Sequence, residues 1–110
     1  MPTTYKVLAQ SAPSATTNTD IYTVPASTQT VVSTLVVANR AATAATYRIA
    51  VRPNGATIAN EHYIAYDVAV GASDSTTITI GITLDPSDLI TVYASTANLS
   101  FNIFGAEITA

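Results

Sequence analysis

The chain contains no cysteine and no tryptophan, and charged residues make up only 10% of its 110 positions. Without cysteine there is no disulfide framework, thiolate nucleophile, zinc ribbon or iron–sulfur site. The charged fraction is well below the roughly 25% of an average soluble domain. The net charge is −3 and the four cations are scattered, so the sequence lacks the basic footprint of a nucleic-acid-binding protein. We therefore expect no nucleic-acid partner.

Long apolar runs are also missing. No run approaches the roughly 20 residues of a membrane-spanning helix. Residues 1–10 lack the basic region and following apolar stretch of a secretion signal. We expect no membrane partner. Asn98-Leu99-Ser100 fits the N-glycosylation pattern, but such tripeptides are common by chance, and without an expected secretion signal this one is set aside.

What the sequence has in abundance is β-branched residues, since Val, Ile and Thr occupy 39 positions. These side chains lose rotamer freedom in helices and pack well on a pleated sheet. Strand-like runs are separated by turn signals about every eight to twelve residues. We therefore predict an all-β fold: a single antiparallel β-sandwich, jelly-roll or immunoglobulin-like, with about eight strands. The expected strands cover residues 4–9, 21–24, 30–38, 46–52, 62–70, 76–84, 89–94 and 99–103.

Alternation within these runs predicts which side chains enter the core. The clearest inward stripe consists of Ile78, Ile80, Ile82 and Leu84. A second consists of Leu99, Phe101 and Ile103, and a third of Ile64, Tyr66, Val68 and Val70. Tyr22 and Tyr47 are also expected in the core. Residues 30–38 break the alternation, which fits a strand buried on both sides or one that crosses from the core to a subunit contact.

The chain is expected to divide near residue 20. Residues 1–20 are predicted to form an N-terminal strand and an extended arm, and residues 21–110 the sandwich. Residues 11–19 are rich in Ser, Thr, Ala, Pro and Asn without an apolar period, which is typical of a surface crossing. Such an arm could pair with the sheet of a neighbouring molecule.

Candidate catalytic and metal-binding residues are few. Nucleophilic catalysis would depend on His62, the one histidine, and no G-x-S-x-G elbow accompanies it. A single His with scattered carboxylates does not predict a zinc site. Asp85 and Asp88 bracket a turn, and side-chain hydrogen bonds to the backbone account for them better than a calcium cage does. We therefore predict no enzyme, no cofactor and no metal, with a small hydrolase of cell-surface polymer as the enzymatic alternative.

Tyrosine and arginine dominate the candidate interface residues, which are Tyr5, Lys6, Arg48, Arg52, Asn54, His62, Tyr63 and Tyr93. Arg48 and Arg52 lie on one strand face, where they could pair with Glu61 and Asp67 on the following strand. Alternatively, an arginine there could meet a carboxylate of a neighbouring subunit. Tyr63 and Tyr93 lie opposite the aliphatic stripes, and tyrosine suits both protein interfaces and sugar-binding surfaces.

An ordered series of segments runs along nearly the whole chain, at residues 5–8, 22–26, 31–40, 47–55, 62–67, 81–84, 92–95 and 101–107. VVSTLVVANR at 31–40, YRIAVRPNG at 47–55 and FNIFGAE at 101–107 are typical of it. The series resembles a family of small, freestanding virion proteins of tailed bacteriophages, those of cyanobacterial and other aquatic phages among them. The resemblance implies a β-sandwich structural protein without enzymatic activity, and it supplies no binding residues.

The role expected from this resemblance is capsid decoration: a cement protein that binds the outer head surface and stabilises it. Its partners would be the major capsid protein or another virion protein, and it would form a homo-oligomer, a trimer or a dimer. Its location would be the virion, assembled in the host cytoplasm. The alternative is a tail, baseplate or fibre component that binds a host-surface glycan.

Overall fold

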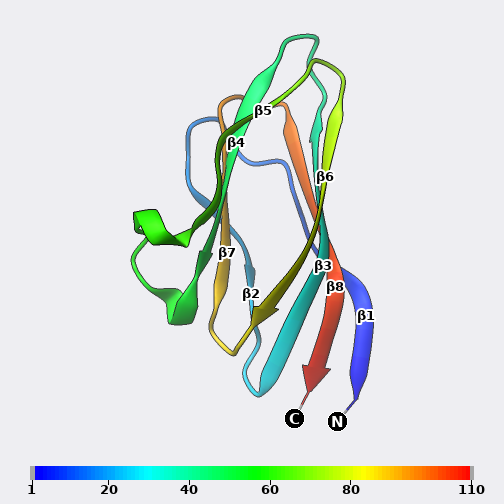
Figure 1. Ribbon diagram of the computed structural model, residues 1–110, viewed down its shortest axis with the longest axis vertical. Coiled ribbons are helices and arrows are strands. Elements are labelled where there is room, and N and C mark those ends of the chain that lie inside the picture. The colour runs from blue at the N-terminus through cyan, green and yellow to red at the C-terminus, as the bar shows by residue number, and fades with distance from the viewer. Residues whose placement is uncertain (1, 110) are drawn as a thin grey trace.

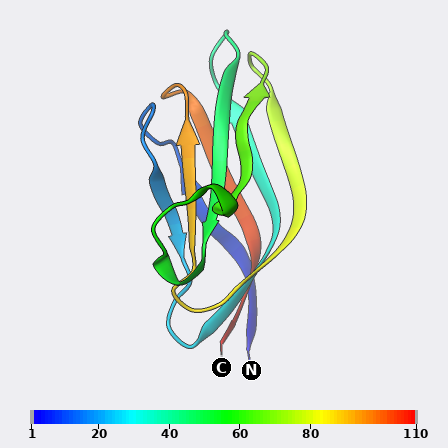
Figure 2. The ribbon, with the colours of Figure 1, turned by 60° about the vertical axis from the view of Figure 1, so that its left-hand side comes forward.

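Two four-stranded antiparallel sheets face one another in the computed structural model, which describes residues 2–109 (Figures 1 and 2). The strands are β1 (Thr3–Ser11), β2 (Thr19–Thr23), β3 (Thr28–Asn39), β4 (Ala45–Arg52), β5 (Tyr63–Val70), β6 (Ser75–Leu84), β7 (Leu89–Ala94) and β8 (Leu99–Thr109). Two short 3-10 turns, η1 (Pro53–Gly55) and η2 (Asn60–His62), connect β4 to β5. The prediction of an all-β sandwich with about eight strands is confirmed. In residues 2–109, no helix has the length and apolar character to cross a membrane.

The chain is wound as a jelly roll. Sheet A has the strand order β1-β8-β3-β6 and sheet B the order β2-β7-β4-β5. Strands pair in a nested order that runs from the two ends of the chain toward its middle: β1 with β8, β2 with β7, β3 with β6 and β4 with β5. This nested pairing gives eight strands in two sheets. An immunoglobulin-like sandwich keeps its first two strands in one sheet, whereas β1 and β2 here lie in different sheets.

The core lies between the sheets and is built by their central strands. Leu99, Phe101 and Ile103 of β8 are fully buried, which confirms the predicted stripe. Tyr47 of β4 packs against Phe101 with an edge-to-face geometry, the ring centroids 6.4 Å apart. This contact joins the two sheets near their centre, because β4 belongs to sheet B and β8 to sheet A.

Gly105 lies where both neighbours of β8 bulge. The register of β1 against β8 shifts between Val7 and Ala9, and that of β3 against β8 shifts between Val32 and Thr34. A Cβ atom on Gly105 would lie 2.1 Å from the carbonyl oxygen of Val31, so a larger residue does not fit here. The bulge in β3 lets Val32, Leu35 and Val37 all face the core although Val32 and Leu35 are three positions apart, whereas Val31 stays on the outer face.

The predicted inward stripe of β6 is confirmed at one end. Ile82 and Leu84 are buried, whereas Ile78 and Ile80 are only partly buried and pack against the rim of the core. β6 is an edge strand of sheet A, and its register against β3 shifts between Thr79 and Ile82.

The predicted stripe of β5 is wrong except at Val70, which is buried. Ile64, Tyr66 and Val68 are exposed, and Ala65 packs against the core instead. The backbone of Asp67 has a φ of 51°, and the register of β5 against β4 shifts beside it. This bulge reverses the faces of the residues that precede it.

The expected arm is part of the sandwich. β1 is the edge strand of sheet A and pairs with β8 along its length. The expected boundary between residues 20 and 21 falls inside β2, which pairs with β7. Residues 12–18 cross from one sheet to the other.

Candidate interaction surfaces

Arg48 leaves β4 on the outer face of sheet B and lies between two tyrosine rings. Its guanidinium carbon is 4.2 Å from the ring centroid of Tyr66 in β5 and 4.2 Å from that of Tyr93 in β7. Its Nε donates a hydrogen bond of 2.7 Å to Oδ1 of Asp67, and its Nη2 donates one of 3.4 Å to Oδ2. The hydrogen bond to Asp67 raises the pKa of the Arg48 guanidinium above its ordinary value. The predicted pairing of Arg48 with Asp67 is confirmed.

Tyr63 extends this arrangement along β5. Its ring meets that of Tyr66 edge-to-face, with centroids 4.9 Å apart and an interplanar angle of 88°. We call Arg48, Tyr63, Tyr66, Asp67 and Tyr93 the Arg48 cluster. Three of its members, Arg48, Tyr63 and Tyr93, were predicted as interface residues, and the structure brings all three together.

Tyr66 is the member of the Arg48 cluster that the sequence pattern misplaced. It was expected in the core, yet 56% of its surface is exposed. The reason is the bulge at Asp67, whose backbone lies in the left-handed region that Asp adopts more readily than most residues. Asp67 itself was the usable signal in the sequence, because aspartate is depleted in strands and is enriched among residues with a left-handed backbone.

Arg52 is held within its own chain. Its Nη1 donates to Oδ1 of Asp20 at 2.9 Å, and its Nε donates to the carbonyl oxygen of Ala56 at 2.7 Å. The hydroxyl of Thr91, which is buried, donates to the same Asp20 oxygen at 2.6 Å. The expected partner of Arg52 on the following strand was Glu61, and the actual partner lies on β2. Arg52 therefore ties the edge strand β2 and the turn after β4 to the sheet.

Asn54 and His62 belong to the connection between β4 and β5. Asn54 lies in η1 with a φ of 52°, and its backbone N–H donates to Oδ1 of Asp88 at 2.8 Å. Nδ1 of His62 accepts a hydrogen bond of 3.0 Å from the backbone N–H of Ala59. Both residues thus hold local turns, and the bond at Nδ1 accounts for the position of the one histidine.

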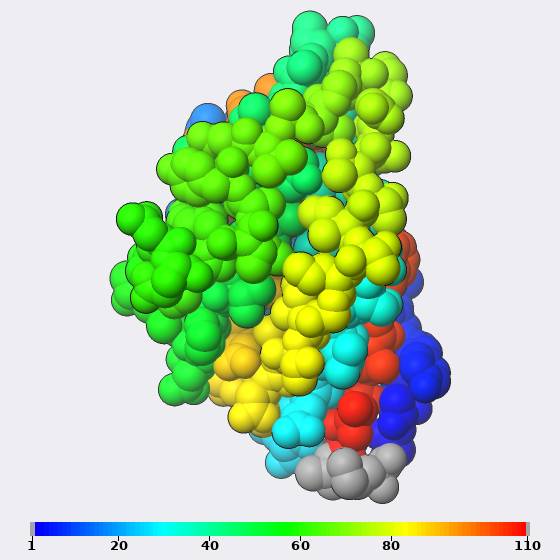
Figure 3. Space-filling model, in the orientation of Figure 1, coloured from blue at the N-terminus to red at the C-terminus, as the bar shows by residue number. Residues whose placement is uncertain are grey.

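The outer face of sheet A carries an apolar groove of about 770 Å³. It lies over β1, β8 and β3, which Figure 3 shows side by side at the surface in blue, red and cyan. The side chains of Tyr5, Val7, Val31, Phe104 and Ile108 line it. Tyr5 is 84% exposed and Val7 is 47% exposed, although the valine side chain and the tyrosine ring are apolar. The predicted interface residue Tyr5 therefore lies on this groove.

Lys6 joins a polar network at the end of the sandwich. Its Nζ lies 3.2 Å from Oε1 of Glu107. The hydroxyl of Tyr22, from the opposite sheet, donates to Oε2 of Glu107 at 2.5 Å and shares a 2.8 Å hydrogen bond with Thr30. Burial, together with the bond to Glu107, raises the pKa of Tyr22 to about 12. The hydrogen bond from Tyr22 lowers the pKa of Glu107.

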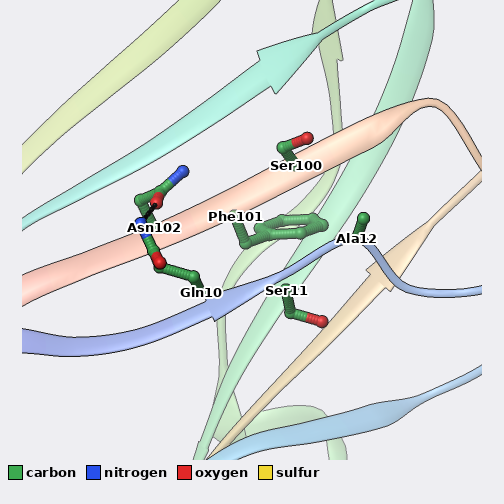
Figure 4. A pocket seen from close by; sticks show the side chains of 6 residues that line it. All are labelled: Gln10, Ser11, Ala12, Ser100, Phe101 and Asn102. Atoms are coloured by element: carbon green, nitrogen blue, oxygen red, sulfur yellow. Dashed lines mark hydrogen bonds between the residues drawn. The ribbon is translucent and has the colours of Figure 1, made fainter.

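A second, smaller groove of about 350 Å³ lies where β1 leaves sheet A (Figure 4). Nε2 of Gln10 donates a 2.8 Å hydrogen bond to Oδ1 of Asn102 across it. Its other lining residues are Ser11, Ala12, Ser100 and Phe101. None of these side chains carries a charge near neutral pH, so the groove offers hydrogen bonds without a charged acid or base. Within residues 2–109, no group of three or more His, Asp or Glu side chains is placed to hold a metal ion.

The predicted interface residues therefore do not form one site. Arg48, Tyr63 and Tyr93 form a cluster on sheet B. Arg52, Asn54 and His62 instead take part in hydrogen bonds that stabilise turns and strands of their own chain. Tyr5 borders the groove on sheet A, and Lys6 pairs with Glu107 in the same sheet. No protein-family model matches the sequence, and no curated protein matches it either.

Proposed function

We propose that the protein is a non-enzymatic structural component of a tailed-bacteriophage virion. In this role it binds the outer surface of the head, through the major capsid protein or another virion protein, and stabilises it. The sequence resemblance supports the virion assignment. The jelly roll is compatible with it, although this fold also occurs in lectins and cupins and does not choose a function by itself.

The observation that supports the proposal most is that the cationic side chains have partners within the same chain. Lys6, Arg48 and Arg52 each pair with a carboxylate of the same chain. Arg40 donates to the hydroxyl of Ser100 and to the carbonyl oxygen of Ala97, each at 2.9 Å. All four cations thus have partners within the protein. A partner protein can therefore cover the faces of the sandwich without removing water from an unpaired cation, a step that would cost free energy.

The exposed apolar side chains supply the matching attraction. They fall into two groups, Tyr5, Val7 and Val31 on sheet A and Ile64, Tyr66 and Val68 on β5. The first group borders the groove over β1, β8 and β3, and exposed apolar surface gathered in this way is typical of an interaction site. A decoration protein needs such surface, because it must fold alone and then bind many equivalent positions on a particle.

The alternative is a tail, baseplate or fibre component that binds a host-surface glycan. Its aromatic platform would be Tyr63, Tyr66 and Tyr93. However, Tyr66 and Tyr93 each turn one ring face toward Arg48, which leaves less open aromatic surface for stacking on a sugar. This arrangement favours the assembly role over the glycan-binding role.

Quantitative densitometry of purified virions tests the proposal. A decoration protein should be present in a copy number comparable to that of the major capsid protein. A copy number comparable to that of the tail proteins would favour the alternative. If the protein is not found in purified particles, the proposed function is wrong.

A further inference from the structure

The outer edge of β1 is free in the part of the chain that the structure describes. β1 pairs with β8 on one side and ends sheet A on the other. A free edge presents unpaired N–H and C=O groups, and proteins commonly protect such edges with charges, prolines or bulges. In β1 the bulge comes only at Leu8, so residues 3–7 form a regular segment. Its single charge, on Lys6, is paired with Glu107 of the neighbouring strand.

The side chains of this segment add apolar surface to the free edge. Tyr5 and Val7 project onto the outer face of sheet A, where they border the groove over β1, β8 and β3. A strand added beside β1 would place its own alternate side chains on the same face. Both requirements for strand addition are therefore present together: backbone groups to pair and an apolar surface to cover.

We propose that residues 3–7 of β1 pair antiparallel with the same residues of a second copy, about a two-fold axis at Tyr5. In this register Tyr5 faces Tyr5 of the second copy, Lys6 faces Thr4 and Val7 faces Thr3. The two lysines are never opposite one another, and each keeps its own Glu107. Facing aromatic side chains stabilise an antiparallel pair, whereas facing like charges destabilise it. The segment is thus complementary to itself, as a two-fold contact requires.

The other free edges fit a second copy less well. β2 has five residues and a register shift beside Asp20, and β5 has its bulge at Asp67. β6 carries no charge, but its register also shifts, between Ile82 and Thr79. Its outward side chains are hydroxyls such as Thr77 and Thr79, which gain less from burial than Tyr5 and Val7 do.

Cysteine cross-linking tests the register directly, because the chain has no cysteine of its own. Facing residues of an antiparallel pair have Cα atoms about 4.5–5.5 Å apart, within reach of a disulfide. A mixture of the Thr4→Cys and Lys6→Cys proteins, oxidised with copper phenanthroline, should give the mixed disulfide dimer. Each variant alone should give little, since its two cysteines would lie more than about 7 Å apart. Thr77→Cys, on the opposite edge of sheet A, is the control and should stay monomeric on a non-reducing gel.

Analytical ultracentrifugation of the cysteine-free protein tests the contact at equilibrium. The wild type should form a dimer, and Tyr5→Lys or Tyr5→Glu should each raise its dissociation constant at least about tenfold. An equimolar mixture of these two variants should recover dimer, because opposite charges then face each other across the axis. Thr77→Lys should leave the dissociation constant unchanged. Circular dichroism establishes that each variant is folded.

A wild type that stays monomeric up to about 1 mM, the weak end of specific association, would overturn the proposal. So would cross-linking of Thr77→Cys, or equal dissociation by Tyr5→Lys and Thr77→Lys. These experiments use the purified protein alone. Their failure is therefore distinguishable from failure of the virion role, on which the two-fold contact does not depend.

Discussion

Gly105 is the position where a single added methyl group should disturb the fold most directly. It lies in β8 between two strands whose register shifts beside it. In Gly105→Ala the new Cβ would lie 2.1 Å from the carbonyl oxygen of Val31, 3.0 Å from Cα of Val32 and 3.1 Å from Cδ1 of Leu8. The first two neighbours are backbone atoms of β3, which cannot rotate away as a side chain can.

The expected cost follows from this geometry. The Val31 oxygen must retreat by more than about 1 Å to reach an ordinary contact, and this shift strains the pairing of β3 with β8. Overpacking of this kind costs about 1–3 kcal/mol, and each weakened ladder hydrogen bond costs about 1 kcal/mol more. Alanine offsets about 0.5–1 kcal/mol of this loss, because it lowers the conformational entropy of the unfolded chain relative to glycine. The net loss should be about 3 kcal/mol, or a fall in Tm of roughly 10–20 °C.

Urea unfolding followed by far-UV circular dichroism measures this loss, and Gly81→Ala is the matched control. Gly81 lies in β6 with no atom within 4 Å of its would-be Cβ, so its substitution should not destabilise the protein and should gain about 0.5–1 kcal/mol through the unfolded chain. The reasoning is refuted if Gly105→Ala unfolds within about 0.5 kcal/mol of the wild type. It is equally refuted if the two variants lose the same amount, since the loss would then not come from the contact with β3.

Three further predictions concern the polar contacts. The pKa of Tyr22 is raised from 10.0 to about 12, so its contribution to stability is complete below about pH 10 and is lost as the pH rises toward 12. The free energy of unfolding of the wild type should fall by about 2–3 kcal/mol over this pH range. In Tyr22→Phe the midpoint of urea unfolding should depend less on pH over the same range, and an equal dependence in both proteins would contradict the prediction. The pKa of Glu107 is lowered, so its contribution is complete above its unfolded pKa of about 4.3 and is lost as the pH falls through the folded pKa. Glu107→Gln should therefore be less stable than the wild type at neutral pH, and the difference should shrink in acid; a constant difference would count against the pKa argument. Arg52→Ala should cost about 1–3 kcal/mol in urea unfolding, because it leaves Asp20 and the Ala56 carbonyl without the guanidinium. Stability equal to the wild type would show that these contacts are replaced by water.

The alternation of apolar residues was sufficient to find the strands and the centre of the core. In β8 it correctly placed Leu99, Phe101 and Ile103 inside. β8 keeps one register along this stripe against both of its neighbours, so the two-residue period of a strand maps directly onto the two faces of the sheet. Where the period holds, local sequence carries the information.

The alternation of residues also placed part of the candidate surface. In the alternating pattern Tyr93 is on the face of its strand opposite to Ile90 and Val92. In the structure its ring lies on the outer face of sheet B beside Arg48. The alternation failed for Tyr66, because the bulge at Asp67 reverses the faces of β5. The partner of Arg52 was also missed, since Asp20 lies 32 positions earlier in the chain and no local pattern connects them.

The sequence by itself determined that this protein is β, where its strands lie and that its surface is poor in charge. These properties depend on residue type and on neighbours a few positions away. Only the tertiary structure decided the nested pairing of β1 with β8 through β4 with β5, the bulges beside Gly105 and at Asp67, and the free edge that exposes Tyr5. Bulges and edges depend on which strand lies alongside, and that choice is made by contacts between segments far apart in the chain.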